Sequence, residues 1–379
     1  MNSHLSEGKF GIERETLRVD SFGRLAQTPH PFGEDPHITR DFCENQIELV
    51  TPPCGSIAEA LSALGELDAR VRKVLAAQGE HLWLYSNPPH IDSEDEIPIA
   101  AFAGAHSEKR LYRKYLEKKY GKKLMLFSGI HFNFSFSDAF LHELNPTHED
   151  FRSFRDALYL RLYKQLMTHS WLLVLLTAAS PYYDASLDEN GKSGIIKSRY
   201  ASMRSGERGY WNPYLPILDH RNLRSFTDSI QKYIRAGLLY SASELYLPVR
   251  LKPRGVNSLE GLAENGVDHI ELRMFDLNPA APLGIDGRDL QFAHLLMLYL
   301  LSLPDFDFTP ALQTEAVIAY KNAALLEPDA ALTEQADEIL HQMEVYFSGC
   351  AEARKVIAYE QKKRSQSPIF SCACGCINR

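Results

Sequence analysis

Acidic, histidine and basic side chains recur at alternate positions in five short stretches of this 379-residue sequence. The first stretch is GIERETLRVD at 11–20, in which one residue separates Glu13 from Glu15. Alternate side chains of an extended strand point to the same face, so both carboxylates would lie beside Leu17 and Val19. Acids are costly in an apolar core, and aliphatic residues are unusual on a wetted face. A strand face that mixes acids with aliphatic residues therefore indicates neither an ordinary core nor an ordinary solvent-facing surface.

The same alternation test groups polar side chains in four further stretches, and it places Phe, Leu, Ile, Val and Met on their opposite faces. The polar sets are Glu44, Gln46 and Glu48 in FCENQIELV; His131, Asn133 and Ser135 in HFNFSF; Tyr246, Arg250 and Lys252 in ELYLPVRLK; and His269, Glu271 and Arg273 in HIELRMF. An ordinary antiparallel sheet with one wetted side is one reading of this pattern.

Metal and phosphate chemistry is the other reading. Carboxylates that are gathered in one place repel each other unless cations lie between them. Oxygen ligands suit Mg²⁺ or Mn²⁺, ions that also bridge nucleotide phosphates. Arg250, Lys252 and Arg273 could bind phosphate oxygens or stabilise a transferred phosphoryl group. The sequence has neither a P-loop nor a Rossmann glycine motif, so a nucleotide would be held in another way.

The elements that would position these side chains are strands separated by long helical insertions. Helices are predicted from Ser56 to Gly79, in KRLYRKYLEKKYG up to Gly121, and at about 148–179, 223–238 and 286–365, the last with proline breaks at 304, 310 and 328. Strands are predicted at 125–136, in SELYLPVRLKP and in DHIELRMFDLNP. This order predicts an α+β fold and not a regular βαβ repeat. The polar faces would form an active-site funnel, and the apolar faces would pack outward against helices.

We predict a single catalytic domain over 1–365, with a helical C-terminal portion, followed by a Cys-rich mobile tail at 366–379. Hydrophobic residues make up 45% of the chain and charged residues 24%, and its net charge of −8 does not favour a nucleic-acid or membrane partner. The apolar run at 171–180 is too short to span a bilayer and is expected to be a buried helix. No signal peptide is recognised, and three of the six cysteines crowd into the tail, so we expect a cytoplasmic protein.

Eight stretches in the correct order resemble the bacterial glutamate–cysteine ligase family, which is related to glutamine synthetase. They are GIERETLRVD, ITRDFCENQIELVTP, LYRKYLEKKYG, SGIHFNFSF, AASPYYDAS, YASMRSGERGYWN, ELYLPVRLKPRG and IELRMFDLNPAAPLGID, and they run from residue 11 to about 286. The resemblance implies a curved, largely antiparallel sheet that forms an active-site funnel. It also implies ATP-dependent ligation of the γ-carboxylate of glutamate to the amine of cysteine. This reaction proceeds through a γ-glutamyl phosphate, needs a divalent metal and is the first step of glutathione synthesis.

The resemblance also implies roles for individual residues. The Mg²⁺ ligands would be Glu13, Glu15, Glu48, His131 and Glu271, with Glu44 as a further candidate. Arg273 would act with Glu271 in catalysis by stabilising the phosphoryl or tetrahedral transition state, and Arg113, Arg250 and Lys252 would contact the nucleotide phosphates. Arg204 would bind an amino-acid carboxylate. The acceptor amino acid would be surrounded by Phe42, Tyr112, Leu116, Met125, Tyr210 and Tyr246.

Two features depart from the family pattern. Met125 stands near a position where the family has a glutamine close to the cysteine thiol, and this favours a ligase with another amine acceptor as an alternative function. A non-catalytic regulatory protein with the same fold is the alternative from another class. The tail SCACGCINR places Cys372, Cys374 and Cys376 at alternate positions, so it is either an incidental disordered end or a redox-sensitive segment.

Overall fold

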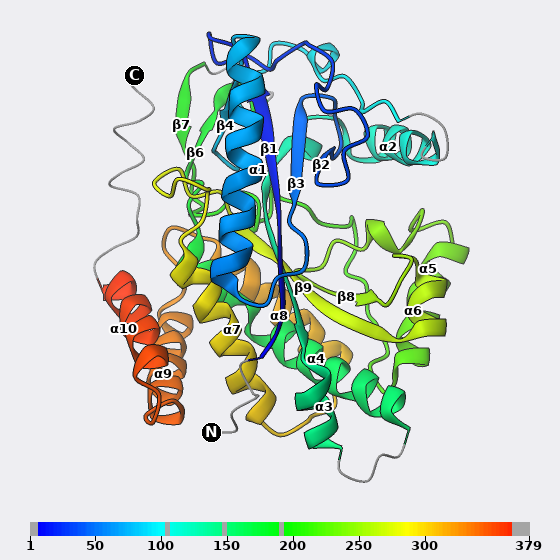
Figure 1. The fold of residues 1–379 in the computed structure, drawn as a ribbon, viewed down its shortest axis with the longest axis vertical. Coiled ribbons are helices and arrows are strands. Elements are labelled where there is room, and N and C mark those ends of the chain that lie inside the picture. The colour runs from blue at the N-terminus through cyan, green and yellow to red at the C-terminus, as the bar shows by residue number, and fades with distance from the viewer. Residues whose placement is uncertain (1–6, 103–106, 146–149, 189–192, 366–379) are drawn as a thin grey trace.

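The computed structural model of this protein describes residues 7–102, 107–145, 150–188 and 193–365 (Figure 1). The predictions for the tail, with Cys372, Cys374 and Cys376, lie outside the described residues.

One antiparallel sheet forms the frame of the molecule. Its strand order is β2–β3–β1–β5–β9–β8, and β4 pairs with β1 outside this path, so seven strands of the described chain take part. The bounds are β1 Gly8–Val19, β2 Ile38–Arg40, β3 Gln46–Val50, β4 His81–Trp83, β5 Gly129–Phe136, β8 Val249–Pro253 and β9 Val267–Asp276. The short strands β6 (Tyr182–Asp184) and β7 (Ile195–Lys197) form a separate pair. The predicted α+β fold with a largely antiparallel sheet is confirmed, and the sheet is open.

Helices cover the apolar face of the sheet. Helix α1 packs on β1 and β3, α4 packs on β8 and β9, and α7 packs on both of these helices (Figure 1). The helix bounds are α1 Ile57–Ala77, α2 Ser107–Tyr120, α3 Asp138–Leu144, α4 Phe151–Thr177, α5 Leu223–Arg235, α6 Leu259–Asn265, α7 Gly287–Ser302, α8 Pro310–Ala323, α9 Ala330–Tyr346 and α10 Ala351–Ser365. Phe132, Phe134, Ile270 and Leu272 are fully buried beneath the helices. Burial of these side chains supplies much of the free energy that holds the layers together.

The helix ends follow the sequence signals. Ser56 caps α1 by accepting a hydrogen bond from the backbone N–H of Glu59, as its position before the apolar pattern predicts. Gly121, with a φ of 77°, follows the last residue of α2 in the left-handed conformation that glycine tolerates. The apolar run after Trp171 is a buried part of α4, and no helix in the described ranges is long and apolar enough to cross a membrane.

Two strand predictions began too early. Residues 124–126 form a 3₁₀ turn, in which the backbone N–H of Phe127 bonds to the carbonyl of Leu124, and β5 starts only at Gly129. Backbone groups that bond locally in this way are not available to pair with a neighbouring strand. Tyr246 precedes β8 and is not part of it. The segment before β8 turns at Ala242–Glu244, where the fully buried carboxylate of Glu244 accepts hydrogen bonds from Lys119, Tyr120 and the backbone of Tyr240.

A second apolar cluster explains the aliphatic residue beside the two acids of β1. Leu17 lies on the same face as Glu13 and Glu15 but packs with Phe42, Cys43, Leu116 and Met125, among others. The polar face of the sheet is therefore acidic in the middle of β1 and apolar toward the end of the strand. The mixed face of the first sequence stretch reflects two adjoining environments.

Candidate functional site

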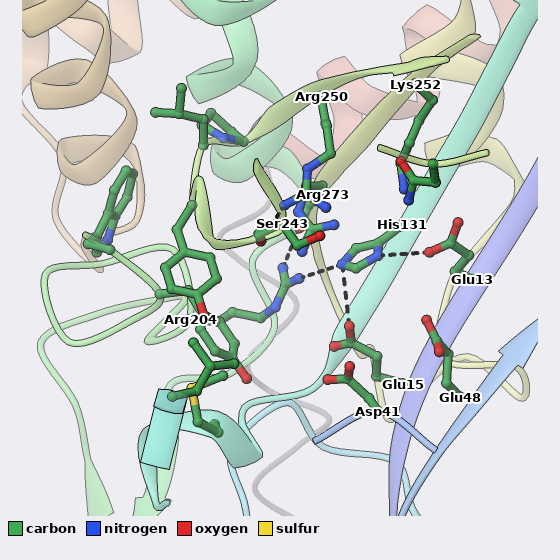
Figure 2. Close-up of a pocket in the computed structure, with 18 of the residues that line it drawn as sticks. Glu13, Glu15, Asp41, Glu48, His131, Arg204, Ser243, Arg250, Lys252 and Arg273 are labelled. Atoms are coloured by element: carbon green, nitrogen blue, oxygen red, sulfur yellow. Dashed lines mark hydrogen bonds and ion pairs between the residues drawn. The ribbon is translucent and has the colours of Figure 1, made fainter. Parts of the chain in front are cut away.

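A cavity of about 370 Å³ opens on the polar face of the sheet (Figure 2). Its wall has an acidic side and a basic side, with the imidazole of His131 between them. The acidic side chains in the wall are Glu13, Glu15, Asp41 and Glu48, and the basic ones are Arg204, Arg250, Lys252 and Arg273. Arrangement of both charge signs around one space suits a substrate that carries phosphate groups and a metal ion.

Strand register brings the acids together. Glu13 of β1 lies opposite His131 of β5, and Glu15 lies opposite Glu48 of β3. Directly opposed residues of an antiparallel pair project to the same face with their Cβ atoms close together. On the far side of β5, Glu271 of β9 is paired with Asn133. The alternation in the sequence therefore predicted this shared face correctly.

His131, Glu13 and Glu271 form the tightest group of potential metal ligands. The Nδ1 atom of His131 is 3.3 Å from Oε2 of Glu13 and 3.5 Å from Oε1 of Glu271, and its Nε2 atom is 3.6 Å from Oε1 of Glu15. Ligand atoms of His131, Glu13 and Glu271 all lie within 4.8 Å of one another. One imidazole nitrogen with several carboxylate oxygens is a donor set that fits Mg²⁺ or Mn²⁺.

Two of the acids are electrostatically unsatisfied, which is the observation that most favours a bound cation. Burial, followed by the charge of Asp41, raises the pKa of Glu15 to about 8. Burial and the charges of Asp41, Glu13 and Glu15 also raise the pKa of Glu48 well above its ordinary value. Their ionised forms are costly in the protein alone, and a divalent ion would offset that cost.

Glu271 has the opposite electrostatic environment. Its burial alone would raise the pKa, but the charges of Lys252, Arg273 and Arg250 outweigh burial and hold the pKa of Glu271 well below its ordinary value. The Nζ atom of Lys252 is 2.6 Å from Oε2 of Glu271, and a guanidinium nitrogen of Arg273 pairs with Oε1. Glu271 thus joins the metal-ligand group to the basic side of the cavity.

The basic side chains come from three different elements. Arg250 and Lys252 are alternate residues of β8, and Arg273 stands on β9 next to a register shift between β9 and β5. Irregularities of this kind redirect side chains near active sites. Arg204 comes from the loop between β7 and α5. Its Nη1 donates to the backbone carbonyl of Arg273 at 2.5 Å, and its Nη2 lies 3.3 Å from Nε2 of His131 (Figure 2).

One end of the cavity is less polar. Tyr112 and Leu116 of α2, Met125 of the 3₁₀ turn, Tyr210 and Tyr246 all contribute to its wall. The hydroxyl of Tyr210 donates to the carbonyl of Phe127 at 2.9 Å, which fixes its ring. This end can enclose a small uncharged side chain, whereas the charged groups of an amino acid would face the arginines.

The structure leaves four predicted site residues out of the cavity wall. Glu271 is fully buried and is joined to the wall by its contacts with His131, Lys252 and Arg273. Glu44 lies in the turn before β3, so the alternation that joins it to Glu48 is broken, and its carboxylate accepts hydrogen bonds from the backbone of His30 and Ala101. Phe42 is buried in the second apolar cluster, outside the wall of the cavity.

Arg113 is the fourth of these residues. Its Nε donates to the carbonyl of Asp41, and its Nη2 lies 3.5 Å from the carbonyl of Arg40. The guanidinium also lies 4.6 Å from the ring centre of Phe102. Arg113 therefore braces the turn that follows β2 instead of standing beside Arg250 and Lys252.

Sequence reasoning missed several residues of the wall. Asp41 is the most important, because its charge contributes to the raised pKa of both Glu15 and Glu48. It lies in a turn and not in a strand, so the alternation test could not find it, although an acid directly before the predicted strand FCENQIELV was visible. Trp211, Ser243, Asn257 and Tyr320 also line the cavity, and the last shows that α8 reaches the site.

Comparisons with known proteins agree with this site. The family model described as glutamate–cysteine ligase matches residues 1–237 and 215–318. The glutathione biosynthesis bifunctional protein GshAB of Listeria innocua is 40% identical over 314 residues, which are 79% of this chain and 41% of that protein. The glutamate–cysteine ligase of Clostridium acetobutylicum is 35% identical over 352 residues, with 79% of this chain and 73% of that protein covered.

Solved structures agree as well. The crystal structure of a bifunctional glutathione synthetase from Pasteurella multocida superposes with a TM-score of 0.85 and 26% identity, over 96% of this chain and 49% of that one. The chain thus spans about half the length of the bifunctional relatives that it matches. With the family model covering most of its length, the chain belongs to the glutamate–cysteine ligase family.

Proposed function

We propose that this protein joins the γ-carboxylate of glutamate to the amine of cysteine at the expense of ATP, as the first step of glutathione synthesis. The observation that carries the proposal is the cavity in which a cluster of acids and a set of arginine and lysine side chains face each other across His131. The family membership and the names of the relatives support the same reaction. We also propose that it works in the cytoplasm, where free thiols persist.

Mg²⁺ or Mn²⁺ would be held by Glu13, Glu15, Glu48, His131 and Glu271, with Asp41 close by. When bound, such an ion would supply positive charge that offsets the charge of the nucleotide phosphates. Arg250 and Lys252 would orient the nucleotide phosphates by charge-assisted hydrogen bonds. Arg273 would stabilise the charge that develops as the γ-phosphoryl group passes to the glutamate carboxylate.

The acyl phosphate formed in this way is easily hydrolysed, so the site must exclude water while the amine attacks the activated carbonyl. Arg204 would hold an amino-acid carboxylate, and the less polar end with Tyr112, Leu116 and Met125 would receive the side chain of the acceptor. No covalent link to the protein is needed, and catalysis would come from positioning and electrostatic stabilisation.

The test is a panel of amines offered to the purified protein with ATP, glutamate and Mg²⁺, with product identified by mass spectrometry. We expect γ-glutamylcysteine, ADP and phosphate in equal amounts. Absence of ATP turnover with every pair of amino acids would contradict the proposal and favour a non-catalytic regulatory protein with this fold.

A ligase with a different amine acceptor is the second candidate, and the buried thioether of Met125 in the cavity wall favours it. Without a polar group at this place, the pocket would sense the size of the acceptor side chain more than its thiol. We therefore expect weak discrimination between cysteine and 2-aminobutyrate in kcat/KM. A preference for cysteine of about a thousandfold would exceed what a size-sensing pocket supplies and would exclude this candidate.

A further inference from the structure

Gly129, the first residue of β5, lies directly beneath the guanidinium of Arg204. A Cβ atom built on Gly129 would stand 2.4 Å from Cζ, 2.6 Å from Nε and 2.8 Å from Nη2 of Arg204. Real side chains do not approach so closely, and any larger residue would have to displace the guanidinium. A glycine inside a strand often marks such a close approach.

The guanidinium that lies on Gly129 has unused donor capacity. Arg204 is buried, its Nη1 and Nη2 have the partners described above, and its Nε is buried without a hydrogen-bond partner. Because Arg204 also forms part of the cavity wall, a bound carboxylate is a suitable partner.

Buried hydrogen bonds hold the loop that carries Arg204 in place. The buried carboxylate of Asp276, at the end of β9, accepts hydrogen bonds from Ser180 Oγ at 2.7 Å and from Ser202 Oγ at 2.9 Å. The hydroxyl of Ser205 is 3.1 Å from that of Tyr320 on α8. Because Ser202 and Ser205, one on each side of Arg204, are anchored in this way, the loop cannot retreat easily from a side chain added at position 129.

We propose that Gly129 is a positioning residue for substrate recognition. Because it has no side chain, the guanidinium of Arg204 can lie against its backbone in the orientation that binds a substrate carboxylate. This inference rests on the proposed function, since it assumes that an amino acid occupies the cavity. Gly129 does not touch the substrate, and it acts only through Arg204.

The test is a double-mutant cycle of Gly129→Ala and Arg204→Ala, with Gly11→Ala as the matched control. Gly11 stands on β1 and faces the same side of the sheet, opposite Asn133, but a Cβ added there would meet its nearest neighbour at an ordinary 3.5 Å. The KM values of ATP, glutamate and the amine acceptor are measured for each variant, and thermal unfolding reports on the fold.

We expect Gly129→Ala to raise the KM of one amino-acid substrate by at least about tenfold, the value of one hydrogen bond to a charged group, while the KM of ATP stays unchanged. In the Arg204→Ala background the same substitution should add less than about twofold, because the two residues act as one unit. An unchanged amino-acid KM in Gly129→Ala, or an equal loss in the Arg204→Ala background, overturns the inference.

Two additions keep the result decisive. If Gly129→Ala does not fold, Ser202→Ala loosens the same loop without added bulk. This variant should raise the same KM by about threefold, as expected for the loss of a neutral hydrogen bond, and no rise overturns the inference.

Calorimetric titration of glutamate and of the acceptor measures affinity without turnover. A wild-type protein that forms no γ-glutamyl product contradicts the proposed function, whereas equal amino-acid affinities of wild type and Gly129→Ala contradict the role of Gly129 alone.

Discussion

The two faces of strand β1 carry buried charges that are handled in opposite ways. On the face toward α1, Arg14 and Arg18 are fully buried, and each is paired: Arg14 with Asp68 at 2.5 Å, and Arg18 with Glu80 at 2.6 Å. On the cavity face, Glu15 has a raised pKa because burial and a neighbouring acid outweigh its cationic neighbours. Charges that are balanced within the chain hold the fold together, whereas an unbalanced set indicates a partner from outside.

Breaking a balanced pair should give the largest effect. We expect Arg14→Met to lower the free energy of unfolding by about 3 kcal/mol, because the buried carboxylate of Asp68 then keeps only the half-exposed Arg72 as a cationic partner. Chemical denaturation with matched m-values measures this change. The double variant Arg14→Met with Asp68→Leu should recover much of the loss, since it removes both buried charges and leaves only the half-exposed Arg72 without its partner. A single variant as stable as wild type would show that the pair is not a structural element.

The neighbouring residue should behave in the opposite way. Glu13→Gln should reduce kcat/KM by ~10²–10³-fold, comparable to the loss of a transition-state contact, with little change in stability. The matched control is Glu44→Gln, the same change in an acid that lies outside the cavity, and it should alter kcat/KM by no more than about twofold. Equal losses in the two variants would show that the cavity does not separate functional from structural acids.

The smallest expected effect is a pH-dependent gain in stability for Glu15→Gln in a metal chelator. Glu15 has an ordinary pKa of 4.5 when unfolded and about 8 in the folded protein, so its contribution to stability is present below pH 4.5 and is lost as pH rises to about 8. Glutamine does not titrate. The variant should therefore match wild type at pH 4.5 and exceed it by roughly 1–3 kcal/mol at pH 8.5. If the free energies of unfolding of wild type and Glu15→Gln change in parallel from pH 4.5 to 8.5, the pKa of Glu15 is not raised by folding.

The cavity face could be predicted from the sequence because strand alternation encodes which side chains share a face. Glu13, Glu15, His131, Glu271 and Arg273 all lie on the face of the sheet where this rule places them. The antiparallel sheet and its covering helices followed from the same periodicities.

The rule fails where the chain leaves the strand. Glu44 and Asp41 lie in turns, so the first was grouped with the wrong side chains and the second was missed. The direction of Arg113 depends on how α2 packs on the turn after β2, and such a tertiary contact leaves no periodic signal. The contact between Arg204 and Gly129 leaves no signal in the sequence either, because it joins a loop and a strand 75 positions apart.

The most direct test of the proposed reaction is the fate of an ¹⁸O label placed in the γ-carboxylate of glutamate. If the carboxylate attacks the γ-phosphoryl group and the amine then displaces phosphate, one labelled oxygen must leave with the inorganic phosphate. We predict one ¹⁸O atom in each phosphate released during synthesis of the γ-glutamyl product, detected by mass spectrometry. Release of unlabelled phosphate alongside that product would contradict the acyl phosphate route, and with it the role that we assign to the two charged sides of the cavity.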